Sequence, residues 1–252
     1  MTSREDALSL LGSVLELFDQ HVNDNLSVRG HDAAVVGLFS RARTLLDAGR
    51  VLIEAHHAEE AMMLGRALYT ESLWLMKLDA AGDERARYSL KWSMGSLQSG
   101  VKLVKTGLKQ GGFTEDQANE ALGYITAEQE AIQAYQRKHN IGSLKSFPDE
   151  ETLAAELGRL RDLQPFLFGH HMVHGSEVSH VWRRELDPET GHYRVAWESH
   201  DEAVDAAVAA FLGRSALYSN QATCHIVGWP EPATFDELLA ETSRLEEMAT
   251  NH

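Results

Sequence analysis

The chain has 252 residues, which suits one large domain or two small ones, and 43% of them are hydrophobic, enough for a packed core. Its formal charge of −15, from 23 Lys and Arg against 38 Asp and Glu, excludes a chain-wide affinity for nucleic acid. A single cysteine, Cys224, excludes an intrachain disulfide and a four-cysteine zinc site. Residues 1–25 are charged throughout and no apolar run reaches about 18 residues, so we expect a cytoplasmic protein without a signal peptide or membrane-spanning helix.

The predicted elements are almost all helices, because no proline precedes Pro148 and apolar residues recur at the three-and-four spacing of a helical face. The pattern changes at about residues 181–198, where strand-like residues on both sides of a proline–glycine turn predict one β-hairpin. We therefore predict an all-α fold: one domain over residues 1–252, a single helical bundle of about eight or nine helices with this hairpin inserted. In chain order, the predicted helices are one through Leu8, Leu11, Leu15 and Phe18, then residues 31–53, 58–79, 83–110, 114–138 (opened by a Thr114–Gln117 capping box), 149–163, a short one from Pro165, 200–227 and 234–248.

Two short segments carry a resemblance to a known family. Residues 61–71, with the sequence Ala-Met-Met-Leu-Gly-Arg-Ala-Leu-Tyr-Thr-Glu, and the later segment Met172-Val173-His174-Gly175-Ser176 resemble an uncharacterised all-helical microbial family, a domain of unknown function. The resemblance extends over about residues 31–230. It implies an α-helical bundle without an established activity, in which three residues line a pocket: Arg66, Glu71 and His174.

A more distant similarity involves residues 170–175, His-His-Met-Val-His-Gly, which look like the signature of the nucleotide-binding and RNase domains shared by prokaryotes and higher eukaryotes. Those domains carry an arginine where this chain has Gly169, and Arg66 on another helix is the candidate substitute. This similarity implies an RNase-type activity with a stress or defence role.

Arg66 lies in a stretch made mainly of Leu, Met and Ala, so we expect its guanidinium to be buried. An unpaired buried charge is costly, and Glu71 is about 140° away on the helix, so we expect a carboxylate partner on another helix. One interpretation is a buried ion pair that locks the bundle. The other is a hydrolase of an anionic, phosphoester-type substrate, RNA included, with Arg66, Glu71 and His174 as catalytic residues; Arg66 binds the anion and His174 is the acid/base group.

His170, His174 and Glu177 fall within about 60° of one another on a helix, a set that suits one divalent ion such as Zn, Fe or Mn. The alternative is a polar turn of histidines with no metal. Two Glu-x-x-His spacings, Glu54 with His57 and Glu177 with His180, also match the paired ligands of di-iron bundles.

The predicted helix over residues 83–110 carries a stripe of cations, and no Asp or Glu occurs from residue 85 to residue 114. One interpretation is a solvated or partner-facing side that pairs with acidic residues of a second subunit, which would make a homo-oligomer. The other is a ridge that binds the phosphates of RNA or another polyanionic substrate. The stripe consists of Arg87, Lys91, Lys102, Lys105 and Lys109.

Three functions therefore remain open from the sequence. The first is an acid/base or metal-assisted hydrolase of an anionic small molecule or RNA. The second is a non-catalytic helical interaction module or scaffold, in which the same charged residues form ion pairs. The third is a mononuclear or di-iron metalloprotein.

Overall fold

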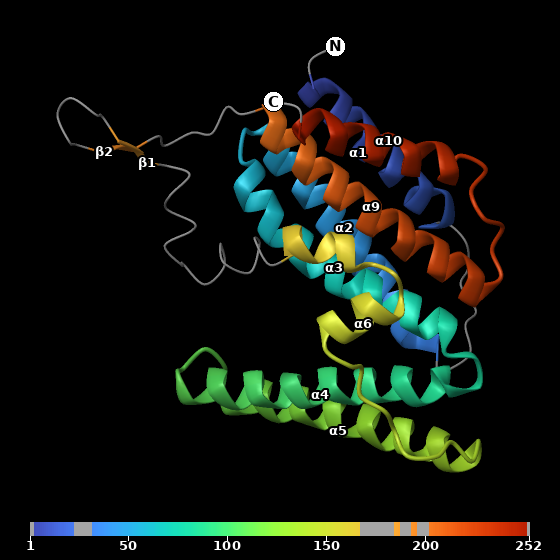
Figure 1. Ribbon diagram of the computed structural model, residues 1–252. Helices are drawn as coiled ribbons and strands as arrows, with labels where there is room; N and C mark the ends of the chain where they lie inside the picture. Colours follow the sequence, from blue (N-terminus) through green and yellow to red (C-terminus); the bar gives the residue numbers. More distant parts are fainter. Residues whose placement is uncertain (1–2, 23–31, 167–183, 187–192, 196–201, 251–252) are drawn as a thin grey trace. The chain divides into compact units, whose positions relative to one another are not determined.

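The computed structural model describes residues 3–22, 32–166, 184–186, 193–195 and 202–250 (Figure 1). Besides a helical segment at residues 163–166, these residues form eight α-helices and two short 3-10 helices, which confirms the predicted all-α class. In chain order they are α1 (Ser3–Val22), α2 (Ala33–Glu54), α3 (Ala58–Ala80), η2 (Gly82–Glu84), α4 (Arg85–Lys109), α5 (Glu115–Lys138), α6 (Glu150–Glu156), η3 (Leu160–Asp162), α9 (Glu202–Val227) and α10 (Phe235–Thr250).

Two strands of three residues each lie in the region predicted as a hairpin. Strands β1 (Arg184–Leu186) and β2 (Tyr193–Val195) pair antiparallel, with Glu185 opposite Arg194. The rest of residues 181–198 lies outside the described part of the chain. A hairpin over that full length is therefore not supported, and six paired residues leave the fold class all-α.

Helix boundaries follow local sequence signals closely. At the start of α5 both hydrogen bonds of the predicted capping box are present: the Gln117 amide donates to Thr114 Oγ1 over 3.2 Å, and the Thr114 amide donates to Gln117 Oε1 over 3.0 Å. The single helix predicted over residues 149–163 is wrong. Instead α6 ends at Glu156, because Gly158 adopts a left-handed conformation with φ of +70°, and η3 follows.

The chain divides into two compact units. We call residues 1–26, 38–79 and 148–252 the bundle unit. Residues 27–37 and 80–147 are called the hairpin unit, after the helical hairpin that α4 and α5 form; the two β-strands are not part of it. Each is described by itself below. A single domain over residues 1–252 stays a prediction, since two compact units can belong to one domain.

The bundle unit has α9 as its central helix. Every residue from 208 to 217 is buried, as expected for a helix that is apolar on all sides. Helices α1 and α10 pack against α9 and against each other (Figure 1). At Gly65 of α3, an added Cβ would lie 3.0 Å from Phe211 of α9, so the glycine permits a close approach of these two helices.

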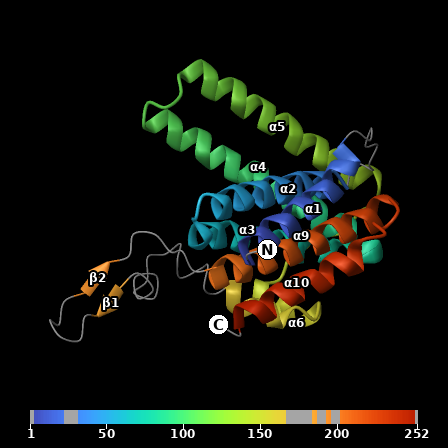
Figure 2. The ribbon, with the colours of Figure 1, turned by 90° about the horizontal axis from the view of Figure 1, so that it is seen from above.

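The hairpin unit consists mainly of α4 and α5, which lie side by side and are joined by a short turn (Figure 2). Its core is small and contains Val104 on α4 with Ala118 and Ile125 on α5. Phe147 extends this unit with a ring that stacks on Tyr88 at 5.4 Å between centroids. Across the described helices of both units, none combines the length and the apolar character needed to cross a bilayer.

Candidate functional site

A buried cluster of charges joins η3, α9 and α10 in the bundle unit. Asp162, 1% exposed, accepts hydrogen bonds from Arg159 Nε over 2.7 Å and from Arg214 Nη1 over 2.6 Å. Both arginines are only 4% exposed. Arg214 also donates from Nη2 to Glu246 Oε2 over 2.7 Å, and Arg161 pairs with the same carboxylate from the surface. Two buried guanidiniums therefore share one buried carboxylate.

The two buried arginines differ in how well their charge is compensated. Burial lowers the pKa of Arg159, and the opposing attraction of Asp162 does not restore it. For Arg214 burial has the same effect, but Asp162 and Glu246 together outweigh it and raise the pKa. Arg159 instead lies over the ring of Tyr218, with Cζ 3.8 Å from the centroid, and its Nη1 is buried without a hydrogen-bond acceptor in the described part of the chain.

Arg66 lies beside an aromatic group that adjoins this cluster. Its guanidinium carbon is 5.3 Å from the centroid of Phe166, whose ring is 5.4 Å from that of Tyr69. Tyr69 in turn donates from its hydroxyl to the carbonyl oxygen of Arg159 over 3.0 Å, and burial raises the pKa of Tyr69 to about 12. Arg66 Nε is buried, and no acceptor for it occurs in the described ranges. Among the described residues Arg66 thus has an aromatic neighbour and not the carboxylate we expected.

Glu71 has a different set of neighbours from Arg66, although both lie on α3. Its carboxylate pairs with Arg41 of α2, with Oε1 2.7 Å from Arg41 Nε, and its side chain is 3% exposed. Burial raises the pKa of Glu71 to about 7, partly offset by Arg41, and Oε2 has no hydrogen-bond partner in the described residues. The structure therefore directs Glu71 toward α2 and Arg66 toward Phe166, as their separation of about 140° around the helix requires.

The predicted metal ligands and the acid/base histidine fall on the segment after Phe166. His170, His174 and Glu177 all lie outside the described residues, so their roles stay predictions. Within the described ranges no group of three or more His, Cys, Asp and Glu side chains could hold a metal ion. The first Glu-x-x-His pair does not share a helix, because Glu54 ends α2 and His57 precedes α3.

The cation stripe predicted for substrate binding lies along α4, which continues through Gly95 and Gly100 without a break. Lys102, Lys105 and Lys109 are exposed, and Lys91 is half-buried. Arg87 is already engaged within the hairpin unit: its Nε donates to the Ser143 carbonyl oxygen and its Nη1 to Glu84, each over 2.6 Å.

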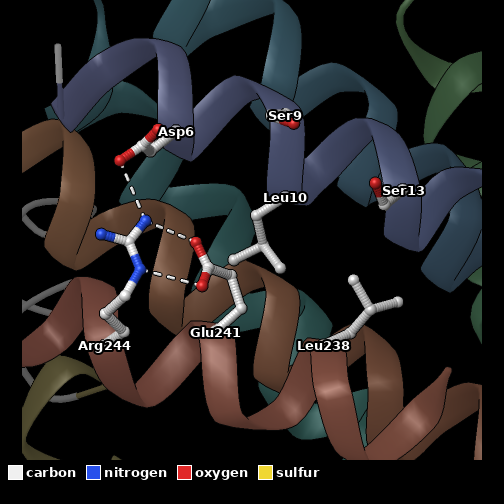
Figure 3. Close-up of a pocket in the computed structure, with 7 residues that line it drawn as sticks. All are labelled: Asp6, Ser9, Leu10, Ser13, Leu238, Glu241 and Arg244. Atoms are coloured by element: carbon white, nitrogen blue, oxygen red, sulfur yellow. Dashed lines mark hydrogen bonds and ion pairs between the residues drawn. The ribbon is translucent and has the colours of Figure 1, made fainter. Parts of the chain in front are cut away.

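A groove between α1 and α10 has a volume of about 390 Å³ (Figure 3). At one end Arg244 bridges the two helices, because Nη2 donates to Asp6 Oδ2 and Nε donates to Glu241 Oε2, each over 2.9 Å. The bond to Glu241 and then that to Asp6 raise the pKa of Arg244. Its charge is thus neutralised by two carboxylates of the groove itself, which makes this a poor site for an anion.

Cys224 is fully buried and lies near a histidine that is distant in sequence. Its Sγ is 3.9 Å from Nε2 of His21, which stacks on Trp229 at 4.1 Å between ring centroids. Burial raises the pKa of Cys224 to about 11, so at neutral pH the side chain is a thiol and not a nucleophilic thiolate. The neighbouring His225 instead contacts Asp79 over 2.9 Å.

Fold and site together define a helical protein with a buried, incompletely compensated arginine cluster. Residues 32–189 match a family of unknown function, DUF5677, and the chain belongs to this family. The match covers more than half of the chain and confirms the expected membership of an uncharacterised helical family. No curated protein and no solved structure matches the chain significantly. The distant similarity to nucleotide-binding and RNase domains stays a prediction.

Proposed function

We propose that the bundle unit binds a phosphate-bearing anion beside Arg66 and the Arg159–Asp162–Arg214 cluster. The observation that supports this is a pair of buried donors for which the described residues supply no acceptor, Nε of Arg66 and Nη1 of Arg159. A buried N–H group that lacks an acceptor costs about 1–3 kcal/mol, more when it is charged, and a phosphate oxygen would remove that cost. The surplus of guanidinium over carboxylate groups favours an anion for the same reason.

The activity we propose is hydrolysis of a phosphoester. Arg66 stabilises the negative charge that develops on the phosphoryl oxygens, and His174, only eight residues after the Phe166 ring that Arg66 contacts, is the acid/base group. An imidazole suits this role because it titrates near neutral pH. The proposed catalytic set also includes Glu71, because its pKa of about 7 suits proton transfer near neutral pH. Its carboxylate lies on the side of α3 that faces α2, where it pairs with Arg41.

Binding is tested by the thermal unfolding midpoint of the protein with inorganic phosphate and with a nucleoside monophosphate. A ligand at about 100 times its Kd stabilises by about 2.7 kcal/mol, which raises the midpoint by about 5–10 °C in a chain of this length. We expect Arg66→Gln to abolish this rise. Arg50→Gln is the matched control, because Arg50 on α2 pairs with Asp47 and Glu54 near the surface. If neither ligand raises the thermal unfolding midpoint of the wild-type protein, the proposed binding site is refuted.

Hydrolysis is tested with bis(p-nitrophenyl) phosphate and with a short RNA. We expect His174→Ala and Arg66→Gln to lose activity by at least about 100-fold, the usual range for a positioned acid/base group, while Arg50→Gln retains it. Equal activity in all four proteins would end the hydrolase proposal, and an Arg66→Gln protein that fails to fold would favour the interpretation of Arg66 as a structural residue.

RNA as the substrate has its own support in the exposed lysines of α4, Lys102, Lys105 and Lys109. If these residues bind phosphates, RNA affinity falls steeply as the salt concentration rises. The slope of the logarithm of the binding constant against the logarithm of salt concentration then becomes shallower by about 0.7 for each lysine replaced by glutamine. Affinity that does not depend on salt contradicts the lysine ridge and leaves a small anion as the ligand.

A metal-assisted mechanism at His170, His174 and Glu177 is the alternative form of the proposal. Elemental analysis of the purified protein for Zn, Fe and Mn tests it directly. Substoichiometric metal that does not rise on reconstitution removes both the mononuclear and the di-iron alternatives.

A cytoplasmic location is part of the proposal as well.

A further inference from the structure

One face of the hairpin unit carries a groove that lies between α4 and α5 at one end and over α5 and Phe113 of the connecting turn at the other. Two adjoining hollows of about 490 and 560 Å³ share Tyr124, which is 67% exposed at the centre of this face. Phe113 lines one end, and Trp92 and Tyr135 line the other. We call this surface the aromatic groove.

Side chains of different sizes line the hollow between the two helices. Helix α4 contributes Ser93 and Ser96 beside larger residues such as Trp92, and α5 contributes Tyr124 and Tyr135. The small core of the pair adjoins the groove, because Ile125 belongs to this core and also lines one of the hollows. Isolated pairs of helices bury little apolar surface, so an aromatic groove on one side favours a partner that covers it.

The charge around the groove is of one sign. Among its lining residues the carboxylates Glu120 and Glu128 are the charged groups, and both are exposed. The lysines of α4 lie elsewhere: Lys102 is about 120° around the helix from Ser96. A ligand that fits therefore combines an apolar surface with positive charge at its edges.

We propose that the aromatic groove binds an amphipathic helix of a partner protein, with an apolar ridge over Tyr124 and lysine or arginine residues against Glu120 and Glu128. Along α5 the groove extends from Gln117 to Tyr135, or about 27 Å at 1.5 Å per residue, so the partner helix has about five turns. This interaction is independent of the arginine cluster, and it gives the hairpin unit a role beyond the proposed hydrolysis.

The probes are three synthetic peptides of about 18 residues, labelled for fluorescence anisotropy and used with the full-length protein at low salt. The first has a leucine ridge at helical spacing with lysine flanks. The second has the same ridge with glutamate flanks, and the third has the composition of the first with the leucines scattered around the helix. Only the first is expected to bind, because only it matches both the shape and the charge of the groove.

Two matched pairs of variants locate the binding on this face. Glu128→Lys and Glu130→Lys change the net charge equally on one helix, but Glu130 does not line the groove; we expect about tenfold weaker peptide binding for the first and no change for the second. Tyr124→Ser is expected to weaken binding by at least about tenfold, whereas Gln133→Ser, outside the groove lining, retains wild-type affinity. Circular dichroism and the unfolding midpoint verify that each variant is folded.

Several outcomes overturn the proposal. Equal binding of the scattered peptide means that charge alone attracts it, and equal weakening by Glu128→Lys and Glu130→Lys means that the attraction is not local. Sedimentation velocity of the chain alone tests a second copy as the occupant. If the chain self-associates and Glu128→Lys abolishes this association, the groove binds the lysine-bearing face of α4 from another molecule and not a partner helix.

Discussion

Replacing Glu71 by glutamine is expected to stabilise the protein at alkaline pH and to leave its stability unchanged at acidic pH. The side chain is 3% exposed, and the pKa of its carboxyl in the folded state is about 7 against an ordinary value of 4.5. The folded state therefore binds the proton more tightly, and stability is lost as pH rises from 4.5 through 7. At about 1.4 kcal/mol per pKa unit, the full cost above pH 7 is up to about 3 kcal/mol.

Glutamine resembles the protonated carboxyl and does not titrate, so the assay compares the two proteins by urea unfolding at about pH 4 and about pH 8. We expect Glu71→Gln to gain up to about 3 kcal/mol over wild type at the higher pH, equivalent to about 6–12 °C in thermal midpoint. Arg41→Gln removes the cation that limits the rise in the pKa of Glu71. In this variant the protonated form of Glu71 persists to higher pH, so the pH-dependent loss of stability ends at a higher pH than in the wild type. Glu60→Gln, at a part-exposed position of the same helix, is the control. A difference between Glu71→Gln and wild type that is the same at both pH values would falsify the reasoning.

Three further predictions concern packing and reactivity. Asp162→Asn removes the carboxylate between two buried arginines and is expected to lower the free energy of unfolding in urea by about 3–5 kcal/mol. Glu156→Gln, at a surface ion pair, is expected to lower it by less than about 1 kcal/mol, and equal losses would contradict a buried network. Gly65→Ala brings a Cβ within 3.0 Å of an aromatic ring and is expected to destabilise by about 1–3 kcal/mol, while Gly12→Ala, which meets nothing within 4 Å, stabilises by about 0.5–1 kcal/mol. Cys224 is expected to resist iodoacetamide in the folded protein and to react in urea, as mass spectrometry would detect; labelling of the native protein at the unfolded rate would mean that the thiol is accessible.

Much of the fold could be predicted because its signals are local. The periodicity of apolar residues placed α3 at residues 58–79, within one residue of its observed end at Ala80, and the Thr114 cap marked the start of α5. The break between α6 and η3 was missed although Gly158 stands in the sequence, because a glycine continues a helix or ends it according to what packs around it.

The site was predictable only in part. Helical periodicity indicated that Arg66 faces apolar neighbours, but it could not identify its contact with the ring of Phe166, which lies 100 positions later in the chain. The pairing of Arg214 with Asp162 spans 52 residues and has no local signature. Arg159 and Asp162 are different, because their spacing of three within one turn was a detectable sign of an ion pair.

The packing of α1 against α9 and α10 has a consequence for synthesis on the ribosome. Helix α1 ends at Val22 and α9 begins at Glu202, so about 180 residues are translated before the first of these partners exists. At about 5–20 residues per second this delay is roughly 10–40 s, during which α1 can already stack Phe18 on Phe39 of α2 but the part of its surface that packs on α9 and α10 stays uncovered. Nascent chains of this protein are therefore expected to depend on chaperones that shield this part of α1 until α9 and α10 have been synthesised.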